Sequence, residues 1–190
     1  MNMEINEQIK SLQEQINEKN KELLRLKMQL GGAEVKDYSL YDKTSAETSF
    51  YSLFGDKDEL LIIQNMGKSC SYCTLWADGF NGTTAHISDR INWALISPDE
   101  PATLKEFAES RNWQFEVYSC HNSSFKSDLG FVWANGSIAP GFSVFKKTDD
   151  GKVIHYAYDW FGPGDQFSPI WHLMNYFPKG NNNWNPKLAY

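Results

Sequence analysis

Near the start of the chain, apolar positions repeat with the period of a coiled coil. In residues 3–30 they form two seven-residue series offset by three positions: Ile9, Ile16, Leu23 and Leu30, and Ile5, Leu12, Lys19 and Leu26. Such a seam, broken once at Lys19, predicts one long helix. The glycine pair that follows, Gly31-Gly32, is a typical helix stop. The helix could pair with a second copy in a homodimer, or pack its stripe on its own domain.

After a polar and aromatic stretch without clear periodicity (residues 33–58), strand and helix patterns alternate. We expect buried strands at 60–65, 91–97 and 114–119, and two strands at 142–147 and 152–158 that are joined by a hairpin turn. Helices are expected at 74–89, irregular around Gly79 and Gly82, and after Pro101. A last helix should start at Ser168 and place Ile170, Leu173, Met174 and Phe177 inward. Residues 121–139 show no regular pattern.

This order predicts an α/β fold with a parallel sheet covered on both faces and an antiparallel hairpin at one edge. The thioredoxin-like fold, in the expanded version of peroxiredoxins, has this order. We therefore expect an N-terminal helix (residues 1–32) and a thioredoxin-like domain (residues 33–190), with a mixed sheet and flanking helices.

Composition narrows the class of protein. The chain has 190 residues, 41% of them hydrophobic, and a net charge of −6. It can bury a core, and it lacks the basic character of a nucleic-acid binder. No segment is long and apolar enough for a membrane span, and the polar, acidic N-terminus does not resemble a secretory signal, so a cytoplasmic location is expected.

Two cysteines separated by two residues, Cys70 and Cys73, lie between a predicted strand and a predicted helix. Such a pair can close a reducible disulfide or hold a metal ion, and this context favours redox chemistry. A helix N-terminus stabilises a thiolate, so we expect Cys70 to attack a partner disulfide and Cys73 to resolve the mixed disulfide.

Five further residues could contribute to this site. Tyr72 and Trp76 are candidates for lining a substrate groove, and Pro140, just before a strand, is expected to be a cis-proline that packs against the pair and binds substrate. Lys68 could add positive potential near Cys70. Asp78 could accept the Cys73 proton.

A metal site is the alternative use of these cysteines. With Cys120 and His121, the pair Cys70 and Cys73 would form a Cys₃His set suited to zinc. Adjacent residues such as Cys120 and His121 do not easily bind one tetrahedral ion, so we expect no metal or other cofactor. Cys120 could also be an additional redox thiol.

The segment 65–82, Asn-Met-Gly-Lys-Ser-Cys-Ser-Tyr-Cys-Thr-Leu-Trp-Ala-Asp-Gly-Phe-Asn-Gly, resembles the signature of a bacterial thioredoxin-like domain-of-unknown-function family, distantly similar to AhpC/TSA proteins. The resemblance continues through residues 125–130, 140–145, 162–165 and 184–187, and covers most of residues 35–190. It implies a thioredoxin fold and says little about substrate.

A thiol–disulfide oxidoreductase acting on a protein or small-molecule thiol or disulfide is the leading hypothesis. A thiol peroxidase is a minor one. The peroxiredoxin pattern Pro-x-x-x-Thr/Ser-x-x-Cys would need proline and threonine or serine where this chain has Met66 and Cys70, and none of its three arginines is close to Pro140 in sequence. Two alternatives come from other functional classes: a zinc-binding protein and a non-enzymatic interaction module.

Overall fold

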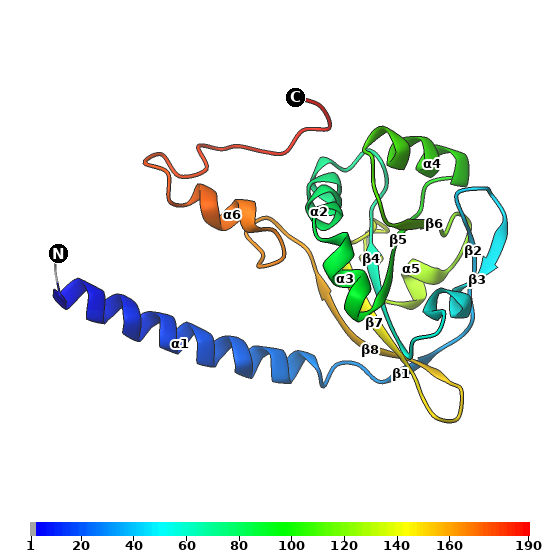
Figure 1. The fold of residues 1–190 in the computed structure, drawn as a ribbon, viewed down its shortest axis with the longest axis horizontal. Helices are drawn as coiled ribbons and strands as arrows, with labels where there is room; N and C mark the ends of the chain where they lie inside the picture. Colours follow the sequence, from blue (N-terminus) through cyan, green and yellow to red (C-terminus); the bar gives the residue numbers. More distant parts are fainter. Residues whose placement is uncertain (1–2) are drawn as a thin grey trace.

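One mixed sheet of eight strands forms the centre of the computed structural model, which describes residues 3–190 (Figure 1). The strand order is β1-β8-β7-β4-β5-β6-β2-β3. The strands are β1 (Ala33–Val35), β2 (Ser39–Tyr41), β3 (Glu47–Ser49), β4 (Glu59–Gln64), β5 (Asn92–Ser97), β6 (Glu116–Ser119), β7 (Gly141–Lys147) and β8 (Val153–Trp160). The helices are α1 (Met3–Lys27), η1 (Phe50–Phe54, a 3₁₀ helix), α2 (Ser71–Asn81), α3 (Thr84–Arg90), α4 (Pro101–Ser110), α5 (Phe125–Asp128) and α6 (Pro169–Met174).

The central strands confirm the α/β prediction. Strand β4 runs parallel to β5, which runs parallel to β6, while β7 is antiparallel to β4 and forms a hairpin with β8. The two central strands, β4 and β5, are continuous apolar runs, because other segments cover both faces of the sheet at these strands.

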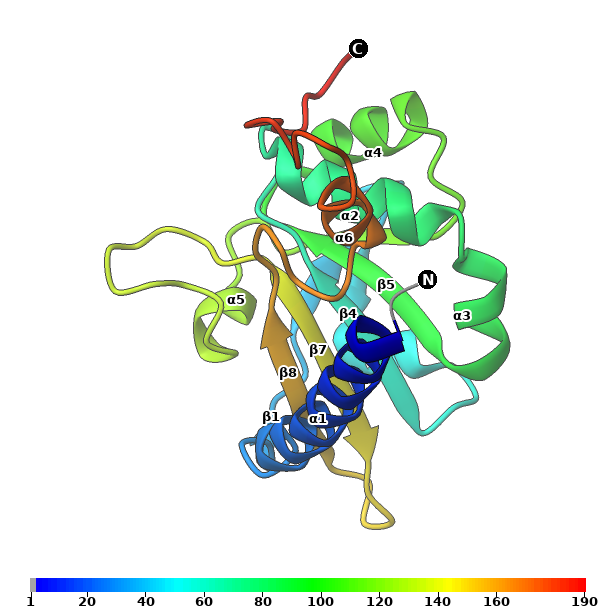
Figure 2. The same ribbon diagram turned by 90° about the vertical axis from the view of Figure 1, so that its left-hand side faces the viewer.

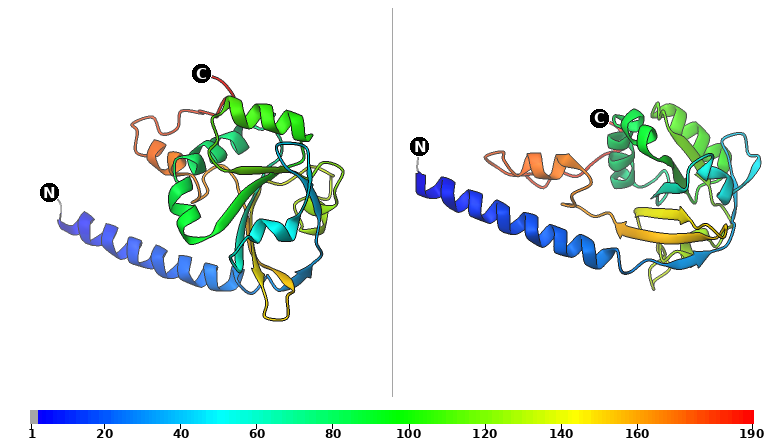
Figure 3. Two further views of the ribbon diagram at one scale, coloured as in Figure 1. Left: turned by 45° about the vertical axis from the view of Figure 1, so that its right-hand side comes forward. Right: turned by 60° about the horizontal axis from the view of Figure 1, so that its bottom comes forward.

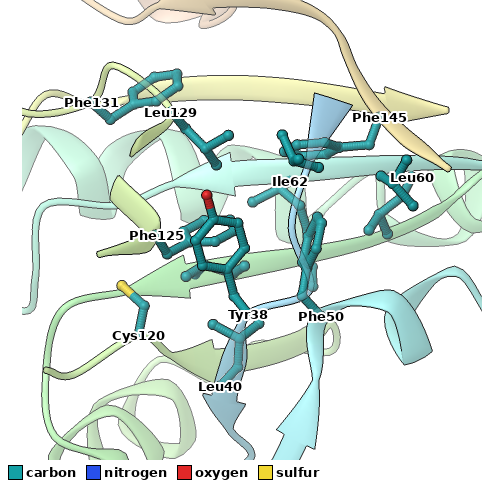
Figure 4. Close-up of a cluster of buried hydrophobic side chains, with 14 of the residues drawn as sticks. Tyr38, Leu40, Phe50, Leu60, Ile62, Cys120, Phe125, Leu129, Phe131 and Phe145 are labelled. Carbon is teal, nitrogen blue, oxygen red and sulfur yellow. The ribbon is translucent and has the colours of Figure 1, made fainter. Parts of the chain in front are cut away.

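Alternate residues of β4 and β5 belong to two separate cores. Leu60, Ile62 and Ile96 pack in a cluster beneath η1 and α5, whereas Ile63 and Leu95 pack against α2 and α4 on the other face. Figure 4 shows the first cluster, where the ring of Phe50 lies between β4, β7 and α5. Its centroid is 4.9 Å from that of Phe145 and 5.3 Å from that of Phe125.

Helix α1 extends away from the sheet along most of its length (Figure 3), and none of its residues is buried. Its last turns lie beside β8 (Figure 2), and Lys27 in the last of them forms an ion pair with Asp159 of β8. A groove of about 290 Å³ separates these turns from β7 and β8. The long-helix prediction is confirmed, and its apolar stripe does not pack into its own domain.

Gly31 is needed for a close approach, since a Cβ atom there would lie 1.8 Å from the Tyr156 carbonyl oxygen. The helix itself has already ended at Lys27, before the glycine pair.

Several boundaries differ from the sequence predictions. The stretch 33–58 contains β1, β2, β3 and η1, the irregular region contains α5, and the helix expected at 74–89 is two helices, α2 and α3. In α6 only Trp171 is buried. Leu173, and Phe177 beyond the end of the helix, are predicted to face inward but are 60% and 61% exposed. The helix is short, and it is anchored by the stacking of Trp171 on Tyr72 of α2. Within the described residues, no helix combines the length and apolar character needed to cross a membrane.

Candidate active site

Cys70 lies immediately before Ser71, the first residue of α2. Its Sγ accepts a hydrogen bond from the backbone N–H of Cys73 at 3.1 Å, and its carbonyl accepts from the N–H of Thr74 at 3.0 Å. A side chain that accepts from the first turn is an N-cap, a position commonly filled by Ser, Thr, Asp or Asn. Here a sulfur has that place, at the positive end of the helix dipole.

The loop between β4 and Cys70 is fixed by polar residues at the ends of two parallel strands. The side chain of Asn65 accepts from the N–H of Gly67 at 2.6 Å, and that of Asp99, just beyond β5, accepts from the N–H of Lys68 at 2.8 Å. Gly67 has φ 111°, and a Cβ atom there would lie 3.1 Å from the Asp99 carboxylate. Glycine is therefore required for both conformation and space.

Hydrogen bonds lower the pKa of Cys70 to about 6. The largest contribution is the hydrogen bond from the Cys73 thiol, followed by the backbone amides of Cys73 and Tyr72, and partial burial opposes them. A large fraction of Cys70 is therefore the nucleophilic thiolate at neutral pH.

Cys73 has the opposite environment. It is buried, and its pKa is raised by the hydrogen bond to Cys70, by burial and by the negative charge of Cys70. The Met66 backbone amide and the Lys126 ammonium act in the other direction. All three cysteines are free thiols, so the structure corresponds to the reduced pair.

The two aromatic candidates are held against α6 and the segments around it. Tyr72 is half-buried, stacks on Trp171, and donates a hydrogen bond to Asn185. Trp76 is only 3% exposed, stacks on Phe161, and its Nε1 donates to Asp165 at 3.4 Å. The structure therefore places Trp76 in the core, not on the surface of a groove.

Pro140 lies one residue before β7, whose Gly141 pairs with Gln64 of β4. It is thus at the edge of the sheet from which the cysteine loop starts. The Ala139–Pro140 bond is trans, since the described residues contain no cis peptide bond, and the expected cis-proline is wrong. The carbonyl oxygen of Pro140 accepts a hydrogen bond from the backbone N–H of Phe161 at 3.0 Å.

Neither of the two expected tuning residues, Lys68 and Asp78, is among the groups that shift the pKa of Cys70 or Cys73. Lys68 is exposed, and the groups that shift the pKa of Cys70 are on α2 itself. Asp78 forms an ion pair with Arg111 and accepts from Trp113 Nε1 at 2.9 Å. Its carboxylate therefore joins α2 to the end of α4, and Asp78 is not among the groups that shift the pKa of Cys73.

The four residues of the zinc alternative are not gathered at one point. The buried thiol of Cys120 donates to the Ser97 carbonyl at 3.3 Å, and it lies at one end of the cluster in Figure 4. The ring of His121 is 3.9 Å from Glu100. Across residues 3–190, no group of three or more His, Cys, Asp or Glu side chains could hold a metal ion.

Lys126 is the site residue that the sequence did not reveal. It lies on α5, is 4% exposed, and its Nζ is 3.0 Å from both the Gln64 side-chain oxygen and the Ile96 carbonyl. The available signal was the polar end of the apolar run 60–63, because Gln64 and Asn65 follow it directly. Polar groups at the carboxyl ends of parallel strands commonly mark a functional edge.

Solved structures show the fold. A peroxidoxin, BcpB, from Mycobacterium tuberculosis superposes with a TM-score of 0.55 at 20% identity, covering 68% of this chain and 84% of that one. A peroxiredoxin-like protein from Aquifex aeolicus gives 0.55 at 22% identity, covering 68% and 75%. AhpC from Enterococcus faecalis gives 0.55 at 14% identity, covering 72% and 83%. The domain therefore has the peroxiredoxin-type thioredoxin-like fold.

No curated protein matches the chain. A family model described as "Bacterial protein of unknown function (DUF899)" matches residues 6–189, almost the whole sequence. The thioredoxin-like domain with its N-terminal helix thus belongs to the DUF899 family of bacterial proteins.

Proposed function

We propose that this protein is a thiol–disulfide oxidoreductase in which Cys70 is the nucleophile and Cys73 the resolving thiol. The observation that carries the proposal is the position of Cys70 as N-cap of α2, with a lowered pKa and with Cys73 hydrogen-bonded behind it. A partly exposed thiolate backed by a buried thiol is the arrangement that two-step disulfide exchange needs.

The reaction proceeds by two exchanges. The Cys70 thiolate attacks one sulfur of a partner disulfide, and the other partner sulfur leaves as a thiolate. Cys73 then loses its proton and attacks Cys70, which forms the Cys70–Cys73 disulfide and releases the second partner sulfur. Two electrons pass from the cysteine pair to the partner, so the chemistry needs no cofactor. The partner is a protein or small-molecule disulfide, or a dithiol for the reverse direction.

A thiol peroxidase is a weaker candidate despite the fold. Of the arginines, Arg90 pairs with Glu59 at the opposite end of β4, and Arg111 pairs with Asp78. Neither is among the groups that shift the pKa of Cys70. The peroxiredoxin threonine position is Cys70 itself.

We also propose that α1 pairs with α1 of a second copy. Every apolar residue of its seam is between 47% and 62% exposed: Ile5, Ile9, Leu12, Ile16, Leu23, Leu26 and Leu30. The flanking heptad positions are mostly Asn and Gln, and the charged exceptions, Glu22 and Lys27, have opposite signs. In a parallel dimer Glu22 would therefore face the partner's Lys27, and the unfavourable like-charge contact would be confined to Lys19 in the seam.

Catalysed reduction of insulin by dithiothreitol tests the oxidoreductase. We expect the wild type and Cys120→Ser to be active, and Cys70→Ser and Cys73→Ser to be inactive. Cys120→Ser is the matched control, because it removes the cysteine that lies outside the pair.

A second readout identifies the intermediate. Cys73→Ser should accumulate a mixed disulfide at Cys70 with a partner disulfide, detectable by mass. Equal insulin reduction by wild type and Cys70→Ser would refute the proposal. Peroxide consumption with a thiol donor that depends on Cys70, without insulin reduction, would favour the peroxidase instead.

A further inference from the structure

Lys126 is a buried cation with no carboxylate partner. Among residues 3–190, no ion pair involves its ammonium, which instead donates to two neutral oxygens, those of Gln64 and Ile96, at 3.0 Å each. Gln64 is itself oriented by a hydrogen bond from its Nε2 to Ser143 at 3.2 Å. A buried charge without a counter-ion costs free energy, so such a residue is expected to have a use.

The two oxygens fix the amine at the functional edge of the sheet. Gln64 ends β4, where the loop to Cys70 begins, and Ile96 lies next to the end of the adjacent parallel strand β5. The same Ile96 carbonyl accepts from the N–H of Asn65 at 3.0 Å. Lys126 thus reaches from α5, on one face of the sheet, to the base of the loop that carries the cysteines on the other.

Lys126 is mostly charged at neutral pH although it is buried. Burial lowers the pKa of Lys126 to about 8. The titratable groups that act on it are the thiols of Cys120 and Cys73 and the carboxylate of Asp99, and all three favour its charged form.

We propose that the Lys126 ammonium, held at the base of the cysteine loop by Gln64 and Ile96, stabilises the Cys73 thiolate in the resolving step. This inference rests on the proposed dithiol mechanism. Cys73 releases its proton to water, the resulting thiolate attacks Cys70, and the partner sulfur leaves as a thiolate. When an external dithiol later reduces the Cys70–Cys73 disulfide, Cys73 takes up a proton from water. Lys126 is a positioning residue, since it acts on the reacting sulfur of Cys70 through Cys73.

The resolving step can be measured separately with 5,5′-dithiobis(2-nitrobenzoic acid) in a Cys120→Ser background. Attack by Cys70 releases one thionitrobenzoate, and attack by Cys73 on the mixed disulfide releases a second. With Lys126→Met and Lys126→Gln, we expect an unchanged first phase and a second phase slowed by about 10- to 100-fold at neutral pH. The pH midpoint of the second phase should rise, because a charge that favours the Cys73 thiolate is lost.

The first phase doubles as a check of folding, since it requires the intact N-terminus of α2. Lys105→Met, at an exposed lysine on α4, is the matched control and should leave both phases unchanged. An unchanged rate and pH midpoint of the second phase in both Lys126 variants would overturn the role of Lys126 and leave the oxidoreductase intact. Release of only one thionitrobenzoate by the protein with native Lys126 would overturn the resolving role of Cys73, and the inference with it.

Discussion

At the scale of single residues, the chemistry of this protein depends on a sulfur in the place of an N-cap oxygen. The N–H groups that would satisfy a serine or aspartate instead stabilise negative charge on Cys70. The neighbouring thiol of Cys73 adds the largest contribution, so one cysteine is activated at the expense of the other.

The reactivity of Cys70 follows from this arrangement. Alkylation by iodoacetamide should follow a titration with a midpoint near pH 6, well below an ordinary thiol. Cys73→Ala should move that midpoint upward, because the strongest donor to the thiolate is lost. Cys73→Ser keeps a hydroxyl donor and should move it less. Equal midpoints in the wild type and Cys73→Ala would contradict the assignment of the cause.

His155 gives the fold a sensitivity to acid. Its ring stacks between Phe145 and Tyr158, its Nε2 has no hydrogen-bond partner, and burial lowers its pKa to about 4. As the pH falls below about 6.5, the unfolded chain takes up a proton here that the folded chain does not, so the free energy of unfolding falls until about pH 4.

The loss attributable to His155 is roughly 3 kcal/mol over that window. Urea denaturation at pH 7 and pH 4 should show a smaller difference for His155→Phe than for the wild type. His86→Phe, at an exposed histidine, is the control and should retain the full difference. The same pH dependence in wild type and His155→Phe would exclude this residue as the cause.

At the scale of elements, α2 is held in place by a residue that the sequence suggested for catalysis. Asp78 connects α2 to Arg111 and Trp113. We expect Asp78→Ala to lower the free energy of unfolding by about 1–3 kcal/mol, because the buried indole N–H loses its acceptor. Asp78→Asn keeps that acceptor and should cost less.

The alkylation midpoint of Cys70 in these variants distinguishes a structural role of Asp78 from an effect on the pKa of the cysteine pair. It should stay near that of the wild type in both, with denaturation reporting the lost stability. A shifted midpoint in Asp78→Asn would restore the role in proton transfer that its sequence position suggested.

The exposed seam of α1 predicts a dimer. Ile16→Lys, in the seam, should lower the mass measured by light scattering from that of a dimer to that of a monomer. Asn17→Lys is the neighbouring control outside the seam. Lys19→Leu restores the interrupted repeat and should lower the protein concentration at which the dimer dissociates. A monomeric wild type would rule out this interface.

The elements that the sequence predicted well are those with long, uniform patterns. Continuous apolar runs identified β4 and β5, and the heptad repeat identified α1. The strands β1, β2 and β3 have three residues each and α5 has four, too short for any periodicity. Their formation depends on partners far along the chain, such as Ser119, which pairs with Tyr41.

At the scale of the whole molecule, the cysteine pair could be predicted and its surroundings could not. A CxxC between a strand and a helix is a local pattern. The burial of Lys126 depends on oxygens 62 and 30 positions away in the chain, at Gln64 and Ile96. The core position of Trp76 likewise depends on Phe161 and Asp165, which the fold brings back over α2.

The Cys70 sulfur at the N-cap of α2 also links the oxidation state of the pair to the stability of the entire chain. Interactions that favour a charged Cys70 exist only while that sulfur is reduced, so they lower the free energy of the dithiol form relative to the disulfide form. We expect the thermal midpoint to be higher for reduced protein than for oxidised protein at pH 7, and the gap to narrow in acid, where Cys70 is protonated. A higher midpoint for the oxidised form would contradict this. By the same linkage, the interactions of the Cys70 thiolate raise the reduction potential of the folded pair.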